Sequence, residues 1–312
     1  MPVAVIDMGS NSTRLLVADL TEPSNPRELE RRSTVTGLAR GVDGSGQLSP
    51  EAIDDVCEVV EGYLGLARSH DADPVIAVAT SAVRDAANGE AFLAEMRERF
   101  ALEARMIDGG TEARLTYRGA TAGRDVSGPT LVFDIGGGST ELIVGDGDGD
   151  GSDDGGLAFR ASLQVGVVRH SERYLRSDPP DPAELEALAD SIGEELTAAR
   201  ASYGGATPIH AIAVAGTPIS MAAIELELDP FDADAVEGHM VGIEFLQHQL
   251  GRLASLTYEQ RRQVQGLHPD RAPTIVTGVV ILIATMRAFG IDAVEVSRND
   301  ILLGAALGAP RA

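Results

Sequence analysis

Residues 133–145 read Phe-Asp-Ile-Gly-Gly-Gly-Ser-Thr-Glu-Leu-Ile-Val-Gly, a pattern that predicts a strand, a tight glycine turn and a second strand. The apolar run 131–133 suits a buried strand, and Asp134 ends it. The glycines at 136–138 let the backbone reverse and approach a ligand closely. Consecutive amides in such a turn can bind an anion, and an acid at the strand end could hold a cation beside it. Taken alone, an ordinary hairpin explains the stretch about as well.

The same pattern occurs at the N-terminus, 127 positions earlier and without a gap. Identical residues pair Asp134 with Asp7, Gly136 with Gly9, Ser139 with Ser12, Thr140 with Thr13, Leu142 with Leu15, Val144 with Val17 and Asp146 with Asp19. Two mismatches are informative, because Gly138 corresponds to Asn11 and Glu141 corresponds to Arg14. One turn therefore carries a cation where the other carries an acid. The repeat predicts two related half-molecules, each with a phosphate-binding turn.

Length and composition indicate a globular α/β protein. The chain has 312 residues, of which 44% are apolar, enough for two domains and a substantial core. The single cysteine, Cys57, lies in an expected helix and is interpreted as a small buried apolar residue. One cysteine allows no internal disulfide framework, which favours a reducing, cytoplasmic location.

No membrane segment is expected. The N-terminal residues Met-Pro-Val-Ala-Val-Ile have no basic region before the apolar run, so they predict a first strand and not a signal peptide. The longest uncharged apolar stretch, 272–286, is shorter than the ~20 residues that span a bilayer. It predicts a buried helix.

The charge balance is strongly acidic. Asp and Glu number 48 against 25 basic residues, and all 25 are arginine. An acidic surface without lysine is typical of a high-salt (halophilic) cytoplasm, where the Debye length falls to ~3 Å at 1 M salt. GC-biased codon use with a merely acidic surface explains it as well. The balance disfavours general nucleic-acid binding. A polyanionic substrate would need a local site of arginines, amides and a divalent cation.

Alternating apolar patterns predict strands and helices in both halves. Strands are expected at 3–6, 15–20, 28–36, 74–79, 104–107, 131–133, 142–144, 159–163, 209–213 and 293–297. Helices are expected at 50–69, 88–100, 112–120, 181–202, 241–256, 258–265, 272–289 and 301–307. The Asp/Gly tract 145–156 starts like a calcium loop, but Leu157 stands where a bidentate Glu is needed. It predicts a solvated hairpin loop.

Several ordered motifs together are specific. They are Ile6–Leu15, Ala79–Ala86, Gly110–Leu115, Phe133–Glu141, Ser162–Arg169, Ala215–Thr217 and Asp270–Ala272. In this order they resemble the motifs of the exopolyphosphatase/guanosine pentaphosphate phosphohydrolase (Ppx/GppA) family, within the actin/Hsp70/sugar-kinase superfamily. The resemblance implies an α/β fold with two actin-like (ribonuclease H-like) domains and an inter-domain cleft. Each domain would be a mixed, mainly five-stranded sheet flanked by helices, at 1–124 and 125–312, with the last helix able to pack back on the first domain.

The resemblance also implies an activity. It is Mg²⁺-dependent hydrolysis of the terminal phosphate of inorganic polyphosphate, of guanosine pentaphosphate, or of both. By motif, Glu112 matches the catalytic base that would align a water for in-line attack. From the residues alone, a first-turn acid favoured by the helix dipole is the better interpretation of Glu112. Asp134 and Glu141 match the Mg²⁺-side carboxylates, as hard oxygen ligands.

The expected phosphate contacts combine guanidinium groups with turn amides. Arg14 and Arg84 would clamp phosphate oxygens bidentately. The predicted phosphate-binding residues are Asp7, Gly9, Ser10, Asn11, Arg14, Arg84, Gly136, Gly137, Gly138, Ser139 and Thr140. Four further arginines could line a substrate channel, or equally form surface ion pairs: Arg40, Arg114, Arg169 and Arg298.

The chain departs from the family pattern in two places. Gly110 and Thr111 stand where the family has acids before the catalytic Glu. The C-terminal pattern Ser-x-x-Gly-Leu-Arg-Glu-Gly becomes Ser-Arg-Asn-Asp-Ile-Leu-Leu-Gly at 297–304, so Leu302 and Leu303 replace its Arg and Glu. These departures leave the choice of substrate and the degree of activity open.

Two other functions stay open. An ATP-dependent kinase of the same superfamily is favoured by the shared turns and by Ala215–Thr217, which resembles an adenosine-side motif. A non-catalytic sensor of polyphosphate or nucleotides is favoured by the C-terminal departures. The family tends to dimerise, so a homodimer is a further expectation.

Overall fold

The computed structural model describes residues 2–22, 25–145 and 156–309. The chain forms two compact units: unit 1 comprises Met1–Arg124 with Asn299–Ala312, and unit 2 comprises Asp125–Arg298. Most of the predicted Asp/Gly hairpin loop, residues 146–155, lies outside the described residues.

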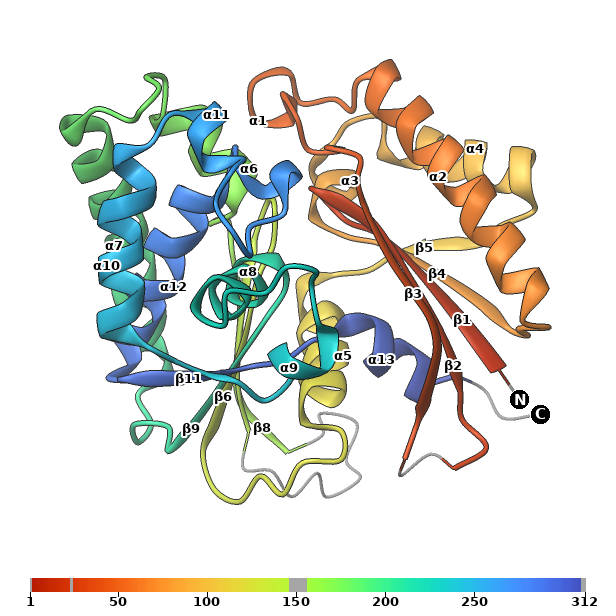
Figure 1. The fold of residues 1–312 in the computed structure, drawn as a ribbon. Helices are drawn as coiled ribbons and strands as arrows, with labels where there is room; N and C mark the ends of the chain where they lie inside the picture. The colour runs from red at the N-terminus through yellow and green to blue at the C-terminus, as the bar shows by residue number, and fades with distance from the viewer. Residues whose placement is uncertain (1, 23–24, 146–155, 310–312) are drawn as a thin grey trace. The chain divides into compact units, whose positions relative to one another are not determined.

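Unit 1 is built on a mixed five-stranded sheet (Figure 1). Its strands are β1 (Pro2–Met8), β2 (Ser12–Asp19), β3 (Arg27–Val35), β4 (Val75–Ala79) and β5 (Ala104–Met106). Its helices are α1 (Val42–Ser45), α2 (Pro50–Ser69), α3 (Ser81–Asp85), α4 (Gly89–Phe100), α5 (Gly109–Thr121) and α13 (Ile301–Leu307). The sheet order is β3-β2-β1-β4-β5, with β1, β4 and β5 parallel and β2 antiparallel to both neighbours.

The C-terminal helix α13 packs on the sheet of unit 1. Leu302 and Leu303 lie in one buried cluster with Val3 and Val5 of β1, and with Leu16 and Ala18 of β2. The family pattern has Arg and Glu at positions 302 and 303, but this chain needs apolar side chains there because the sheet face beneath is apolar. The expected helix 301–307 therefore belongs to the core of unit 1.

Two glycines bring α5 and α13 into backbone contact. A Cβ on Gly119 of α5 would overlap the backbone carbonyl of Asp300, and a Cβ on Gly304 of α13 would overlap that of Leu115. Helices approach this closely only where side chains are absent. The contact fixes Asp300, at the start of α13, against the helix that carries Glu112.

Replacing Gly304 by alanine is expected to lower the free energy of unfolding by about 3 kcal/mol, because the new methyl group meets backbone that cannot rotate away. The matched control is Gly62→Ala in the interior of α2, where a Cβ meets open space. That change should raise the free energy by about 1 kcal/mol through helix propensity. Chemical denaturation of the three proteins measures both effects. Equal midpoints for Gly304→Ala and the parent would contradict the packing described here.

Unit 2 contains a mixed six-stranded sheet. Its strands are β6 (Thr130–Ile135), β7 (Thr140–Gly145), β8 (Leu157–Leu163), β9 (His210–Val214), β10 (Met240–Gly242) and β11 (Ala293–Val296). Its helices are α6 (Val167–Tyr174), α7 (Pro182–Tyr203), α8 (Gly216–Glu225), α9 (Ala233–Val236), α10 (Ile243–Ser255), α11 (Tyr258–Arg261), the 3-10 turn η1 (Pro269–Arg271) and α12 (Ile275–Phe289). The order β8-β7-β6-β9-β11 repeats that of unit 1, with β10 added at the edge.

The prediction of a helix over 241–256 is wrong at its start. Met240–Gly242 form the edge strand β10, in which Val241 is buried opposite Val294 of β11. The helix α10 begins only at Ile243, after Gly242 at its N-cap in an extended conformation. The pattern of an apolar residue beside a glycine is compatible with either a strand or a helix. Here the segment forms a strand because it pairs with the edge of β11 that would otherwise be unpaired. This strand accounts for the sixth member of the sheet.

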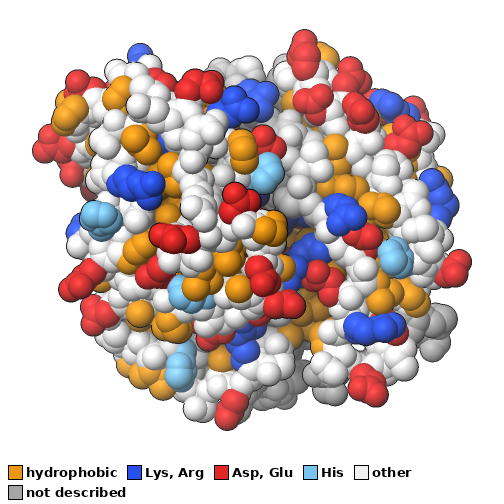
Figure 2. Space-filling view, in the orientation of Figure 1, with side chains coloured by type: hydrophobic (Ala, Val, Ile, Leu, Met, Phe, Trp, Pro, Cys, Tyr) orange, Lys and Arg blue, Asp and Glu red, His pale blue; other side chains and the backbone are white. Residues whose placement is uncertain are grey.

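The described surface is acidic, and acidic side chains are scattered over the whole face shown in Figure 2, with arginines among them. Among the described helices, none is both long and apolar enough to cross a bilayer. Cys57 is buried in α2, and burial raises the pKa of its thiol to about 11. The interpretation of Cys57 as a small buried apolar residue is confirmed.

Candidate functional site

The two hairpins of the sequence repeat are equivalent residue by residue. In β1–β2, Asp7 lies opposite Arg14, and in β6–β7, Asp134 lies opposite Glu141. The turn of each hairpin is closed by the same bond, from the Gly9 amide to the Ser12 carbonyl (3.1 Å) and from the Gly136 amide to the Ser139 carbonyl (2.9 Å). Each cross-strand pair of the first hairpin therefore corresponds to the pair 127 positions later in the second hairpin, the same offset as in the sequence.

In unit 2, the start of α6 holds the carbonyl side of the glycine turn. The Gly136 carbonyl accepts from the Val167 amide (3.0 Å), and the Gly137 carbonyl accepts from the Val168 and Arg169 amides (2.9 and 3.2 Å). The Gly138 carbonyl accepts from the Arg169 Nε (2.9 Å). In a trans peptide the N–H points opposite to the carbonyl. The amides of residues 137–139 therefore point away from α6, as an anion-binding turn requires.

The turn of unit 1 is held in the same way by the loop after β3. The Asn11 carbonyl accepts from the amides of Thr36 and Gly37 (3.1 and 3.0 Å), and the Ser10 carbonyl accepts from the Ala39 amide (2.7 Å). The amides of Asn11 and Ser12 therefore point away from this loop. Each unit presents consecutive amides on one side of its turn, which is the arrangement predicted for phosphate binding.

The hydroxyl side chains of Thr140, Thr13 and Ser10 connect the two turns to neighbouring segments. Thr140 Oγ1 donates to the Val165 carbonyl (2.6 Å), and its counterpart Thr13 pairs with Thr36 Oγ1 (3.0 Å). Ser10 Oγ lies 2.8 Å from Ser81 Oγ and accepts from the Ala82 amide of α3 (3.2 Å). This bond brings the first turn and the Thr80–Arg84 segment of unit 1 together, although they are far apart in the sequence.

Unit 2 also carries the predicted metal-side carboxylates. Asp134 and Glu141 are buried cross-strand neighbours, and Ser162 Oγ donates to Glu141 Oε1 (2.8 Å). Among the described residues, no three or more His, Cys, Asp or Glu side chains converge on one point. Two carboxylates fit Mg²⁺, which usually takes one or two protein carboxylates and completes its shell with water and substrate phosphate.

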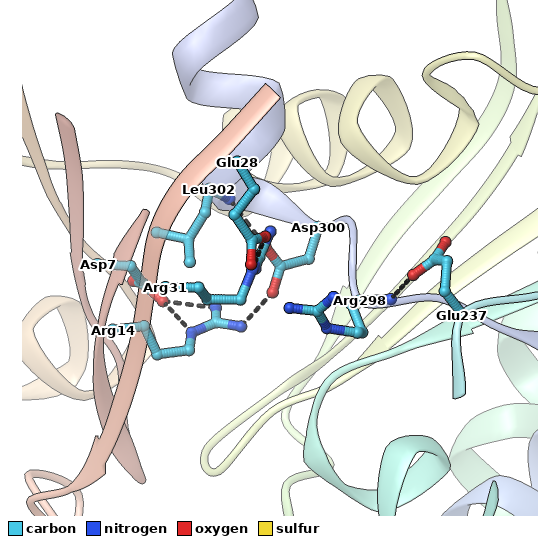
Figure 3. A network of polar contacts seen from close by, with 8 residues as sticks. All are labelled: Asp7, Arg14, Glu28, Arg31, Glu237, Arg298, Asp300 and Leu302. Atoms are coloured by element: carbon cyan, nitrogen blue, oxygen red, sulfur yellow. Dashed lines mark hydrogen bonds and ion pairs between the residues drawn. The ribbon is translucent and has the colours of Figure 1, made fainter. Parts of the chain in front are cut away.

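In unit 1, Arg14 contacts two carboxylates (Figure 3). Its Nε and Nη2 donate to Asp7 Oδ2 (2.9 and 2.5 Å), and its Nη1 donates to Asp300 Oδ2. Asp7 is only 1% exposed and Asp300 only 4%. Arg14 was predicted to bind phosphate, and the structure shows that its guanidinium binds two carboxylates, one of them 286 positions away in the sequence.

Polar atoms without partners lie beside this turn. Within the described residues, Asp7 Oδ1 and Asn11 Nδ2 are buried and have no hydrogen-bond partner. Burial raises the pKa of Asp7 despite the Arg14 guanidinium, which acts in the opposite direction. Unpartnered buried polar atoms are costly, so their presence in one turn points to a group that binds there.

Glu112 is held near the N-terminus of α5. Asp108 caps this helix by accepting from the Thr111 amide (2.8 Å), and this hydrogen bond lowers the Asp108 pKa. The Glu112 side chain is buried and accepts from Arg84 Nη1 (3.2 Å), which also donates to the Ile107 carbonyl (2.9 Å). The structure thus pairs the predicted base with the predicted phosphate clamp of the same unit.

The sequence reasoning missed Asp300. The C-terminal departures that the sequence analysis identified were Leu302 and Leu303, which replace the family's Arg and Glu. The signal was present two residues earlier, since Asp300 stands where the family pattern has glycine. Its contact with Arg14 depends on where α13 packs, which no local pattern shows.

Comparison with known proteins agrees with the motifs. The sequence profile of the Ppx/GppA phosphatase family matches residues 16–305. Exopolyphosphatase 2 of Mycobacterium tuberculosis is 34% identical over 318 aligned positions, covering 98% of this chain and 97% of that protein.

Solved structures show the same fold. The Aquifex aeolicus member of the Ppx/GppA family has a TM-score of 0.81 at 26% identity, covering 99% of this chain and 97% of the other. An exopolyphosphatase of Cytophaga hutchinsonii has a TM-score of 0.88 at 23% identity, covering 100% and 99%, and shares the fold. The profile match, the relatives and the two equivalent turns agree, and the chain belongs to the Ppx/GppA phosphatase family.

Proposed function

We propose that this protein is a Mg²⁺-dependent exopolyphosphatase that releases the terminal phosphate of inorganic polyphosphate by attack of an activated water. Guanosine pentaphosphate, which ends in the same kind of phosphoanhydride, is a second candidate substrate. The observation that carries the proposal is the pair of equivalent turns, each with consecutive amides directed away from the segment that holds its carbonyls. A chain with net charge −23 that binds a polyanion needs such local sites.

Each unit would contribute a different part of the chemistry. In unit 1, Glu112 would align and deprotonate the water, and Arg84 would hold a phosphate oxygen while keeping Glu112 in place. The amides of each turn would bind further phosphate oxygens of the polyphosphate chain. Phosphoryl transfer depends mainly on positioning and charge stabilisation, so these groups are chemically sufficient.

Asp134 and Glu141 would hold the Mg²⁺. When bound, the ion would neutralise charge on the phosphate oxygens of the transferred group. The residues of unit 2 would fix the substrate by the amides of 137–139, whose direction is set by α6. Arg169 would stabilise this turn, because its Nε donates a hydrogen bond to the Gly138 carbonyl.

The proposal is tested by phosphate release in molar KCl with Mg²⁺, using polyphosphate, guanosine pentaphosphate and ATP in parallel. We expect orthophosphate from polyphosphate, loss of release with EDTA, and products shortened from the end on a gel. The ratio of kcat/KM values ranks polyphosphate against guanosine pentaphosphate. Tight binding of tripolyphosphate without release would support a sensor, and ATP consumption that requires a phosphate acceptor would support a kinase. Either result would overturn the proposal.

A further inference from the structure

We infer that Asp300 is a positioning residue of the unit 1 phosphate turn, which holds Arg14 at one oxygen of Asp7 and keeps the other oxygen clear. The inference deepens the proposed function, and its kinetic test rests on that function. A separate, spectroscopic test does not.

The two oxygens of Asp300 have separate tasks. Oδ1 accepts from the Leu302 amide (3.0 Å) and caps α13, while Oδ2 accepts from Arg14 Nη1. The side chain has little freedom, because Asp300 is 4% exposed and its backbone carbonyl is packed against Gly119 of α5. Asp300 is thus a fixed acceptor on the opposite side of Arg14 from Asp7.

The geometry of Arg14 depends on this second acceptor. Both Nε and Nη2 donate to the same Asp7 oxygen, Oδ2, while Asp7 Oδ1 has no partner within the described residues. A guanidinium and a carboxylate left to themselves favour two parallel bonds, one to each oxygen. By engaging Nη1, Asp300 excludes the end-on arrangement, which would use Nη1 and Nη2, and fixes the Nε and Nη2 edge of the guanidinium on Asp7 Oδ2, while Asp7 Oδ1 receives no bond from Arg14. Asp7 is the penultimate residue of β1, just before the turn, with its carboxylate beside Gly9.

The contact also explains a departure in the sequence. At the position where the family pattern has glycine, this chain has an acid, and two residues later the family Arg is Leu302, which is buried in the core. The carboxylate of Asp300 faces the cation of the turn directly, in the same unit. The substitution of glycine by an acid is therefore matched to Arg14 and is not a neutral surface change.

The first experiment needs no substrate. Protein labelled with ¹⁵N-arginine is compared as parent and as Asp300→Ser, with the Arg14 Nε–H signal assigned by its loss in Arg14→Lys. Serine keeps the helix cap but is too short to reach Arg14. We expect hydrogen exchange of this N–H, which donates to Asp7, to become about tenfold faster, because the guanidinium loses the charge-assisted bond from Nη1 that holds it in place. Ser49→Ala, which removes the cap of α2, is the control and should leave the signal unchanged. An unchanged rate in Asp300→Ser would overturn the inference.

The second experiment is kinetic and uses a double-mutant cycle. Asp300→Asn retains one acceptor oxygen for the cap and should lower kcat about tenfold with less than a twofold change in KM. In an Arg14→Gln background the same change should cost less than twofold, because Asp300 acts through Arg14. Losses that multiply in the double variant would overturn the inference. If the parent releases no phosphate, the proposed function fails, and the exchange measurement still decides the role of Asp300.

Discussion

Replacing Glu112 by glutamine is expected to lower kcat for phosphate release by about 10²–10⁴-fold, with little change in KM. Glutamine has the same shape and can still accept the hydrogen bond from Arg84, so the local structure should persist. What is lost is the negative charge that would take the proton of the attacking water. Steady-state kinetics of release from polyphosphate in molar KCl measure the change.

The control addresses the alternative that Glu112 only complements the helix dipole. Glu90 occupies the first turn of α4 as Glu112 does in α5, but it is exposed. Glu90→Gln should therefore keep kcat within twofold of the parent. If Glu112→Gln keeps a comparable rate, Glu112 is not the base, and its burial beside Arg84 serves stability.

A methyl group at Gly166 is expected to reduce kcat/KM by about 10²-fold, because it would displace the turn of unit 2. Gly166 is the N-cap of α6, and a Cβ there would overlap the Gly137 carbonyl and the Gly138 backbone. The amides of that turn are the proposed phosphate donors, and the loss of one such donor typically costs 10²–10³-fold. The backbone at Gly166 is extended, with φ −138°, so alanine adds no conformational strain of its own.

The matched control is Gly242→Ala in the same unit. Gly242 is also the N-cap of a helix, α10, with an extended backbone, but a Cβ there meets open space. Its kcat/KM should stay within twofold of the parent. Both variants are measured well below their unfolding midpoints, with circular dichroism as the check on folding. Half or more of the parental activity in Gly166→Ala would show that the turn does not bind the transferred phosphate group.

Several features followed from local patterns. The hairpins, their common register and the glycines of the turns were predictable because strand alternation and turn chemistry act over a few residues. Ser49 and Pro50 marked the start of α2 in the same way, and the helix runs from Pro50 to Ser69 as expected. The edge strand β10 was not predictable, since its pairing partner β11 lies about fifty residues further along the chain.

In the candidate site, too, some features follow from local patterns and others depend on the tertiary structure. Glu112 and Arg84 were each identified by motif, but their mutual hydrogen bond depends on α5 packing beside the end of β4. The motif predicted only that Arg14 binds phosphate. It did not predict the geometry that the contacts with Asp7 and Asp300 impose on the guanidinium. The direction of the turn amides likewise depends on which segment holds the carbonyls.

The sequence by itself determined the two β-hairpins of the repeat, because every interaction that forms them is local. The side on which each turn displays its amides came from α6 and from the loop after β3, which bind the carbonyls from a distance along the chain. The contact of Arg14 with Asp300 depends on α13. This helix buries Leu302 on the sheet of unit 1 and thereby places Asp300, from the far end of the sequence, beside Arg14. Contacts between residues so far apart in the sequence form only when the whole core is packed. No local sequence pattern therefore predicts them individually.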